Sequence, residues 1–94
     1  MALEFEWDPA KAATNLRKHG VSFDEAATAF ADPLASTITD RAHSIDEERL
    51  VIFGTSERSR VLAVMFTERG PRVRVISARE ATRPEREAYE AGTL

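Results

Sequence analysis

The sequence predicts an α+β domain in which one antiparallel sheet follows two helices and precedes a third. Three segments rich in β-branched and apolar residues, 48–55, 60–68 and 72–79, are joined by connections of hairpin length, which is typical of an antiparallel meander. Two capping-box patterns, one before the meander and one after it, predict helices on either side.

The first elements expected are a short strand and a helix. Residues 3–7 alternate apolar with acidic side chains, which is typical of a half-exposed strand at a sheet edge. Asp8 is a suitable N-cap for a helix that ends at Gly20. Lys18 and His19 fall in the last turn, where the helix dipole favours cations.

A second helix is expected directly afterwards. Ser22 and Glu25 form the first capping-box pattern, and apolar residues then recur with helical spacing up to residue 30. An Asp-Pro pair ends this helix. Residues 34–39 are expected to form an additional strand, and residues 40–46 are polar enough to form a loop.

Within the meander, residues 61–66 are apolar on both faces and predict the central, most buried strand. In the last strand, 72–79, regular pairing predicts two faces by simple alternation. One face would carry Val73, Val75, Ser77 and Arg79, and the other Arg72, Arg74, Ile76 and Ala78.

Arg79 lies where the last strand passes into the C-terminal helix. Thr82 and Glu85 form the second capping-box pattern, so this helix is expected to begin near Thr82. A guanidinium at the end of an interior strand is well placed to serve a pocket. The alternative is an ion pair with Glu85 or Glu87 at the helix start, and the residue pattern alone leaves both possibilities open.

Length and composition limit the class of protein. The 94 residues are enough for a single domain, 1–94, with its own core. The absence of cysteine excludes disulfides, thiolate metal sites and cysteine nucleophiles. No run of 18 apolar residues occurs, so we expect a soluble, cytoplasmic protein. Neither metal-ligand spacing nor a glycine-rich phosphate loop is present, and we expect no cofactor.

Charge is distributed unevenly along the chain, although the net charge is only −3. Residues 1–48 hold four Lys/Arg and ten Asp/Glu, a balance of −6, whereas residues 49–86 hold nine Arg and four Glu, a balance of +5. Arginine forks onto phosphate, so the second half can present a cationic surface to a nucleic acid. The alternative is a solvated strand surface with scattered ion pairs.

Several short motifs together resemble the BrnT family, ribonuclease toxins of bacterial type II toxin–antitoxin pairs. They are Trp7-Asp8-x-x-Lys11, Asn15-x-x-Lys18-His19-Gly20-Val21-x-Phe23, Ala26 with Phe30, Glu48-Arg49, Gly54 and Ile76-Ser77-Ala78-Arg79-x-Ala81-Thr82-x-x-Glu85-x-x-x-Tyr89. The resemblance implies a fold similar to the RelE toxins and an RNA-cleaving activity. It also implies a small antitoxin partner, usually a ribbon-helix-helix protein of the BrnA type, through which operator DNA would be contacted only indirectly.

Given this resemblance, the expected reaction is metal-free attack of an RNA 2′-hydroxyl on the adjacent phosphate. Such a site needs a base, an acid and cations for the crowded phosphate oxygens. Arg79 is the candidate for phosphate stabilisation, with Arg49 or Arg69 assisting. His19 and Glu48 are the base and acid candidates, and the sequence does not assign one role to each.

Two further residues are RNA-binding candidates, Lys18 for a backbone phosphate and Tyr89 for stacking or proton donation. Each candidate also has a structural explanation. Glu48 would pair with Arg49 or Arg60 across strands, His19 would cap its helix, and Tyr89 would pack its ring against the sheet. A non-catalytic module that binds the antitoxin and adjusts repression of the shared operator is the alternative function.

Overall fold

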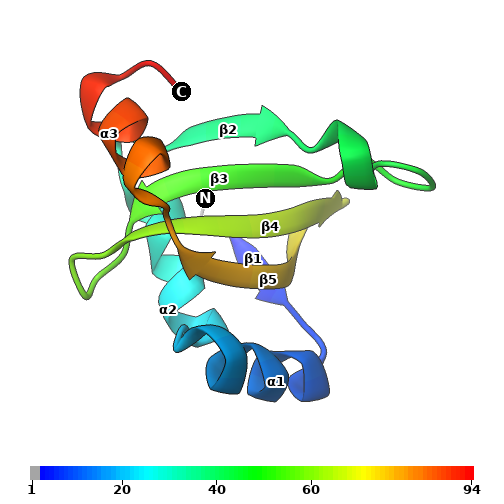
Figure 1. Cartoon of the computed structure of the whole chain (residues 1–94). Helices are drawn as coiled ribbons and strands as arrows, with labels where there is room; N and C mark the ends of the chain where they lie inside the picture. Colours follow the sequence, from blue (N-terminus) through cyan, green and yellow to red (C-terminus); the bar gives the residue numbers. More distant parts are fainter. Residues whose placement is uncertain (1–2) are drawn as a thin grey trace.

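The computed structural model describes residues 3–94, which form a five-stranded mixed sheet and three α-helices (Figure 1). The strands are β1 (Glu4–Glu6), β2 (Ser36–Thr39), β3 (Leu50–Thr55), β4 (Val61–Arg69) and β5 (Arg72–Glu80). The helices are α1 (Pro9–His19), α2 (Phe23–Thr28) and α3 (Arg83–Ala91), with short 3-10 helices η1 (Ala29–Ala31) and η2 (Arg41–His43). None of the helices in residues 3–94 is both long and apolar enough to cross a membrane.

The strand order is β1-β5-β4-β3-β2, which confirms the antiparallel meander of β3, β4 and β5 and the central place of β4. The expectation of a purely antiparallel sheet was wrong, because β1 runs parallel to β5 with Glu4 opposite Arg72. Two helices and three strands separate β1 from β5, and a connection of that length permits either direction. Alternation in 3–7 located an edge strand correctly but held no information about its direction.

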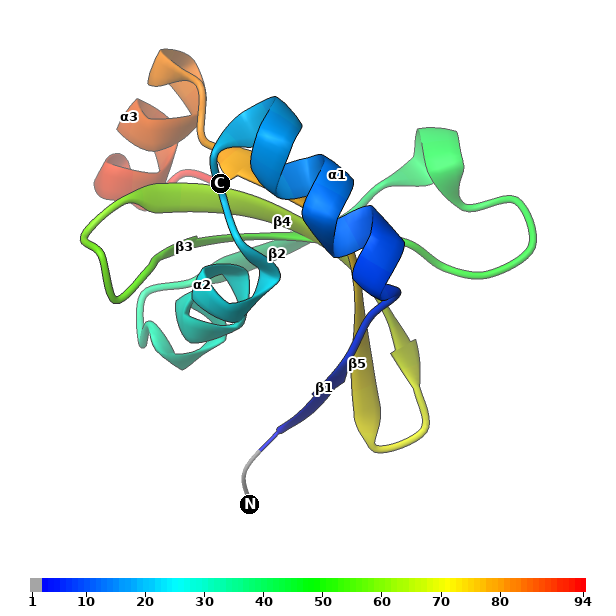
Figure 2. The same ribbon diagram turned by 90° about the horizontal axis from the view of Figure 1, so that it is seen from below.

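The helices lie on opposite faces of the sheet (Figures 1 and 2). We call the face packed against α1 and α2 the lower face, and the face against which α3 packs the upper face. The lower face carries the main core, including Phe23, Leu62, Val64 and Val75. The upper face has a smaller cluster formed by Val51, Phe53 and Ala63, against which Tyr89 and Leu94 pack.

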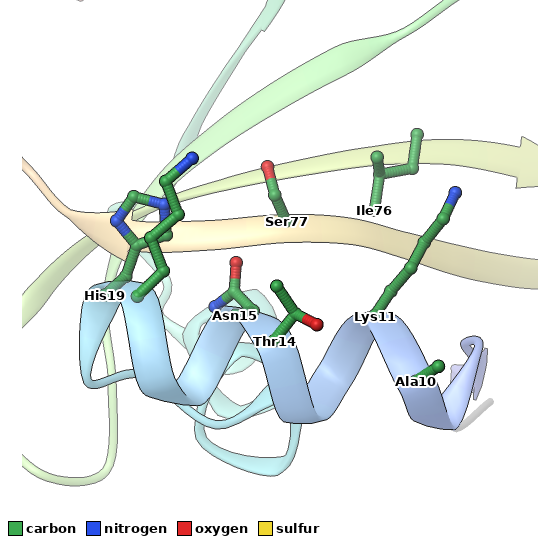
Figure 3. Close-up of a pocket in the computed structure, with 8 residues that line it drawn as sticks. Ala10, Lys11, Thr14, Asn15, His19, Ile76 and Ser77 are labelled. Carbon is green, nitrogen blue, oxygen red and sulfur yellow. The ribbon is translucent and has the colours of Figure 1, made fainter.

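A β-bulge in β5 changes which of its residues share a face. Phe66 of β4 pairs with Val75 and Met65 pairs with Ser77, so Ile76 has no partner on β4. The predicted alternation of residues 72–79 therefore holds as far as Ile76 and is wrong for Ser77, Ala78 and Arg79. The lower face receives Val73, Val75 and Ala78, because the extra residue shifts the pattern by one position. Ile76 and Ser77 both project from the upper side of the strand (Figure 3).

The cap predictions are confirmed, with one difference. Asp8 accepts a hydrogen bond at the start of α1, Gly20 ends it with a φ of 68°, and Thr82 begins α3 in a complete capping box. Ser22 accepts a hydrogen bond from the backbone N–H of Glu25. The Glu25 carboxylate, however, binds Ser56 and Arg60 of the β3–β4 connection, so this capping pattern is used in one direction only.

Asn15 attaches α1 to the second half of β5. Its Nδ2 donates to the carbonyl of Ala78 at 2.8 Å and to that of Val21 at 2.9 Å, and its Oδ1 accepts from the N–H of Ala78 at 3.1 Å. Since β1 pairs only with residues 72–74, this carboxamide satisfies Ala78 where no neighbouring strand does.

Replacing Asn15 with Ala should lower the free energy of unfolding by about 2–3 kcal/mol, because three buried backbone groups lose their partner. Thr14→Ala is the matched control on the exposed side of the same turn and should change stability by less than about 0.5 kcal/mol. Urea unfolding of both variants measures the difference. Equal stabilities would contradict the role given to Asn15.

Candidate functional site

Two clefts meet at the bulge of β5. One, of about 330 Å³, lies between α1 and β5, and the other, of about 170 Å³, lies over β4. Both are lined by Ile76 and Ser77, so we treat them as one feature and call it the β5 groove. The first cleft adds Ala10, Lys11, Thr14, Asn15, Lys18 and His19, and the second adds Asp40, His43, Arg49 and Met65.

The α1 side of the groove carries basic side chains. Lys11 and Lys18 are seven residues apart and therefore lie on one face of the helix. Figure 3 shows Lys11 and His19 projecting to the same side as Ile76 and Ser77. The helix thus supplies two ammonium groups and an imidazole along one wall.

The opposite wall contains Arg49 and a histidine–aspartate pair. Arg49 is half-buried, and its Nε is buried without a hydrogen-bond partner among residues 3–94. Nδ1 of His43 lies 2.9 Å from a carboxylate oxygen of Asp40, an arrangement that orients the imidazole ring. Within the same residues no group of three or more His, Asp and Glu side chains is placed to hold a metal ion.

The cations of the groove differ from most other basic residues of the protein. Six arginines form ion pairs, namely Arg60, Arg69, Arg72, Arg74, Arg79 and Arg83. In the part of the chain that the structure describes, no such pair involves Lys11, Lys18 or Arg49. A cation without an anionic partner retains its capacity to bind phosphate, so three such residues along one groove make it a candidate anion-binding surface.

Arg79 lies on the upper face opposite Ala63, and its guanidinium binds Glu85 with two hydrogen bonds of 2.7 and 3.0 Å. The hydrogen bonds from Arg79 hold the pKa of Glu85 at about 2 despite its partial burial, and the same contact raises the pKa of Arg79. This is the ion pair that the residue pattern offered as the alternative to a pocket role. Glu87 is not its partner, because Glu87 pairs with Arg83.

Glu48 and Arg69 lie outside the two clefts. Glu48 is exposed just before β3, and its carbonyl accepts a hydrogen bond from Thr67. Arg69 is exposed at the end of β4, 3.8 Å from Glu47. The structure therefore brings together His19, Lys18 and Arg49 from the predicted set, but places these two residues apart from them.

Tyr89 anchors α3 to the sheet. Its hydroxyl donates to Asp32 and lies 3.0 Å from Oγ1 of Thr55. Burial, together with the hydrogen bond to Asp32, raises the pKa of Tyr89, so the hydroxyl stays protonated at neutral pH. Burial acts to raise the pKa of Asp32, but hydrogen bonds from the N–H of Thr55 and from Tyr89 outweigh it and lower that pKa. The ring packs on the upper-face cluster, in agreement with the structural explanation.

Sequence reasoning missed several residues of the groove. Ser77 was assigned to a regular strand and His43 to a loop without a role, because a bulge and a loop conformation bring them together. Lys11 had a usable signal, since its seven-residue spacing from Lys18 predicts a shared helix face.

Fold and site together define a small α+β domain with a cation-lined groove suited to phosphate. Residues 7–85 match the family described as "Ribonuclease toxin, BrnT, of type II toxin-antitoxin system", and the chain belongs to this family. A search of curated proteins gives no match. Among solved structures, the 1.1 Å crystal structure of the Brucella abortus ribonuclease toxin BrnT is similar, with a TM-score of 0.67 and 27% identity. The match covers 87% of this chain and 100% of the Brucella chain.

The Arg79–Glu85 pair generates a prediction about stability and pH. Because the pKa of Glu85 falls from 4.5 to about 2 on folding, the stabilisation is complete above pH 4.5 and is lost as the pH falls towards 2. Glu85→Gln keeps a residue suited to the capping box and removes only the charge. It should lower stability at pH 7 by about 1–2 kcal/mol and by progressively less below pH 4.5.

The control is Glu87→Gln, because Glu87 and its partner Arg83 are both exposed and such pairs contribute little. Chemical unfolding between pH 2 and pH 7 measures both variants against the unchanged chain. A deficit for Glu85→Gln that stays constant over this range would contradict the assignment of the pair.

Proposed function

We propose that this chain is an endoribonuclease toxin that cleaves RNA in the β5 groove and inhibits translation and growth in the bacterial cytoplasm. We assign it to the RelE-like class of toxin domains. Membership of the BrnT family supports the activity, and the similar Brucella abortus protein is itself named a ribonuclease toxin. The observation that carries the location is the row of cations along the groove, Lys11, Lys18 and Arg49, which form no ion pair within residues 3–94.

The proposed reaction needs no metal ion. The RNA 2′-oxygen attacks the neighbouring phosphorus, the bond from phosphorus to the 5′-oxygen breaks, and a 2′,3′-cyclic phosphate and a free 5′-hydroxyl form. One group accepts the 2′-proton and another protonates the leaving 5′-oxygen. We propose His19 and His43 for these two steps, since they lie in the two clefts that meet at Ser77.

Arg49 and Lys18 are proposed to neutralise the phosphate oxygens from opposite walls of the groove. Arg79 lies two residues after Ser77 on the same strand, and we propose it as a secondary phosphate contact because Glu85 already occupies its guanidinium. Because Glu48 lies outside the groove, we propose it as a proton-transfer group only for an RNA that extends beyond the groove. Arg69 is likewise a peripheral contact, and Tyr89 is proposed to act by anchoring α3.

Arg49→Ala should lower the rate of RNA cleavage by about a hundredfold, because it removes a positioned cation from the charge that develops in the transition state. Arg79→Ala should lower the melting temperature more than Arg49→Ala does, because it removes both hydrogen bonds between Arg79 and Glu85. Cleavage is measured on purified protein with RNA in excess EDTA, and the new ends are tested for cyclic phosphate.

Arg83→Ala is the matched control, since Arg83 is exposed on α3, pairs with Glu87 and lines neither cleft. It should cleave at the unchanged rate. Folded, unmodified protein that leaves RNA intact would refute the proposed function. Activity that depends on added divalent metal would refute the metal-free reaction. Full activity of Arg49→Ala would show that the active site lies outside the β5 groove.

We also propose that a ribbon-helix-helix antitoxin of the BrnA type covers the groove. Acidic side chains of such a partner would meet the unpaired cations, and apolar side chains would pack on Met65 and Ile76, which are partly exposed. The two proteins should co-purify even in about 1 M salt. At that concentration the attraction between charges is screened beyond about 3 Å, and contacts between apolar side chains dominate the affinity.

Lys11→Glu combined with Lys18→Glu tests the location of this complex and should weaken it markedly at low salt. Arg72→Glu, on the outer half of the sheet near β1, is the control and should bind normally. Separate elution of the two unmodified proteins at micromolar concentration would refute the partner. Equal binding by both charge-reversed variants would refute the surface.

A further inference from the structure

An ion pair with a buried carboxylate, Glu25–Arg60, lies next to the end of α1 that carries His19. The Glu25 side chain is only 3% exposed, and both of its carboxylate oxygens bind Arg60. Its second oxygen also accepts from Ser56 at 2.7 Å. The Arg60 side chain is 26% exposed. Removing a carboxylate from water costs free energy that the attraction to its partner can fail to repay, so a pair of this kind is weak evidence for a purely stabilising role.

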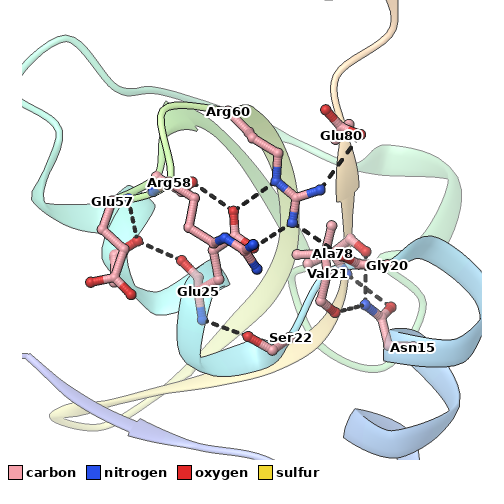
Figure 4. Close-up of polar contacts among 12 residues, drawn as sticks. Asn15, Gly20, Val21, Ser22, Glu25, Glu57, Arg58, Arg60, Ala78 and Glu80 are labelled. Carbon is pink, nitrogen blue, oxygen red and sulfur yellow. Dashed lines mark hydrogen bonds and ion pairs between the residues drawn. The ribbon is translucent and has the colours of Figure 1, made fainter.

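Arg60 also contacts residues at the end of α1 and at the end of β5. Its Nη2 donates to the carbonyl of Gly20 at 3.0 Å, and its Nη1 lies 3.6 Å from a carboxylate oxygen of Glu80 (Figure 4). Gly20 is the C-cap of α1 and directly follows His19. The carbonyl groups at a helix end have no partner within the helix, and this one is held by the Arg60 side chain of the β3–β4 connection.

The next carbonyl is held as well. Asn15 donates to the carbonyl of Val21, so the two residues after His19 are both tied to groups that are themselves fixed (Figure 4). Arg60 in addition joins α2, through Glu25, to the end of β5, through Glu80. Helix ends otherwise fray, and an exposed imidazole on a frayed turn has no fixed position.

We propose that Arg60, oriented by Glu25, is a positioning residue that fixes the last turn of α1 and thereby holds His19 beside Ser77 in the β5 groove. This inference rests on the proposed function, in which His19 transfers a proton. Arg60 itself is not a lining residue of either cleft, so it acts through α1 and not on RNA.

Two variants separate positioning from folding. Arg60→Lys keeps a positive charge beside Glu25, but a single ammonium group does not reproduce the fork that reaches Glu25 and Gly20 together. Glu25→Leu combined with Arg60→Met replaces the buried pair with apolar side chains, an exchange that is often neutral or stabilising. Arg58→Met is the matched control, since it removes an exposed arginine from the same hairpin and leaves Gly20 bound.

Both test variants should remain folded and should lose about tenfold or more in kcat, with KM changed less than about twofold, because misplacing a proton-transfer group affects the chemical step. Arg58→Met should keep both constants. The NMR signals of the His19 ring, assigned by comparison with His43→Asn, should shift and broaden in the test variants and stay unchanged in Arg58→Met.

The cleavage assay and the His19 NMR signals test the two claims independently. If the unmodified chain cleaves no RNA, the proposed function is refuted, and the His19 signals alone then decide the positioning inference. Folded test variants with unchanged His19 signals overturn it in either case. Unchanged kcat in both test variants also overturns it when the unmodified chain is active.

Discussion

The extra residue in β5 determines what each face of the sheet presents. Val73 and Val75 are buried on the lower face, and a regular strand would then point Ser77 downwards as well. Because Ile76 has no partner on β4, Ala78 takes the next buried position instead. Ala78 has a side chain small enough for α1 to approach β5 closely. Ile76 and Ser77 are left together on the upper side, where they form the floor shared by both clefts.

The position of α1 depends on the same point of the strand. β1 pairs only with the first residues of β5, so the backbone at Ala78 would otherwise expose unpaired groups. Asn15 satisfies both of them with one carboxamide, which docks a helix where a strand would usually lie. A docked helix presents a whole row of side chains along the strand edge. The Lys11 and Lys18 side chains are carried to the groove in this way.

The sequence predicted the elements better than their contacts. Capping residues such as Asp8 and Thr82 act within a few residues of themselves, and they located α1 and α3 closely. Gly54 stood in a recognised motif, but its reason is tertiary, since a Cβ there would lie 2.6 Å from the carbonyl oxygen of Ala29. The direction of β1, the bulge at Ile76 and the partner of Glu25 also depend on residues distant in the chain. Local patterns contain no information about them.

The same limit applies to the candidate site, where counting arginines was less informative than knowing their partners. The balance of +5 in residues 49–86 suggested a basic face, yet most of those arginines are neutralised by nearby carboxylates. At physiological salt, screening limits the range over which exposed charges interact to about 8 Å. The net charge of −3 therefore says little about any one surface. What determines anion binding is the local set of unpaired cations. Arg49, beside the bulge, belongs to that set, whereas Arg79, two residues beyond Ser77, is bound to Glu85.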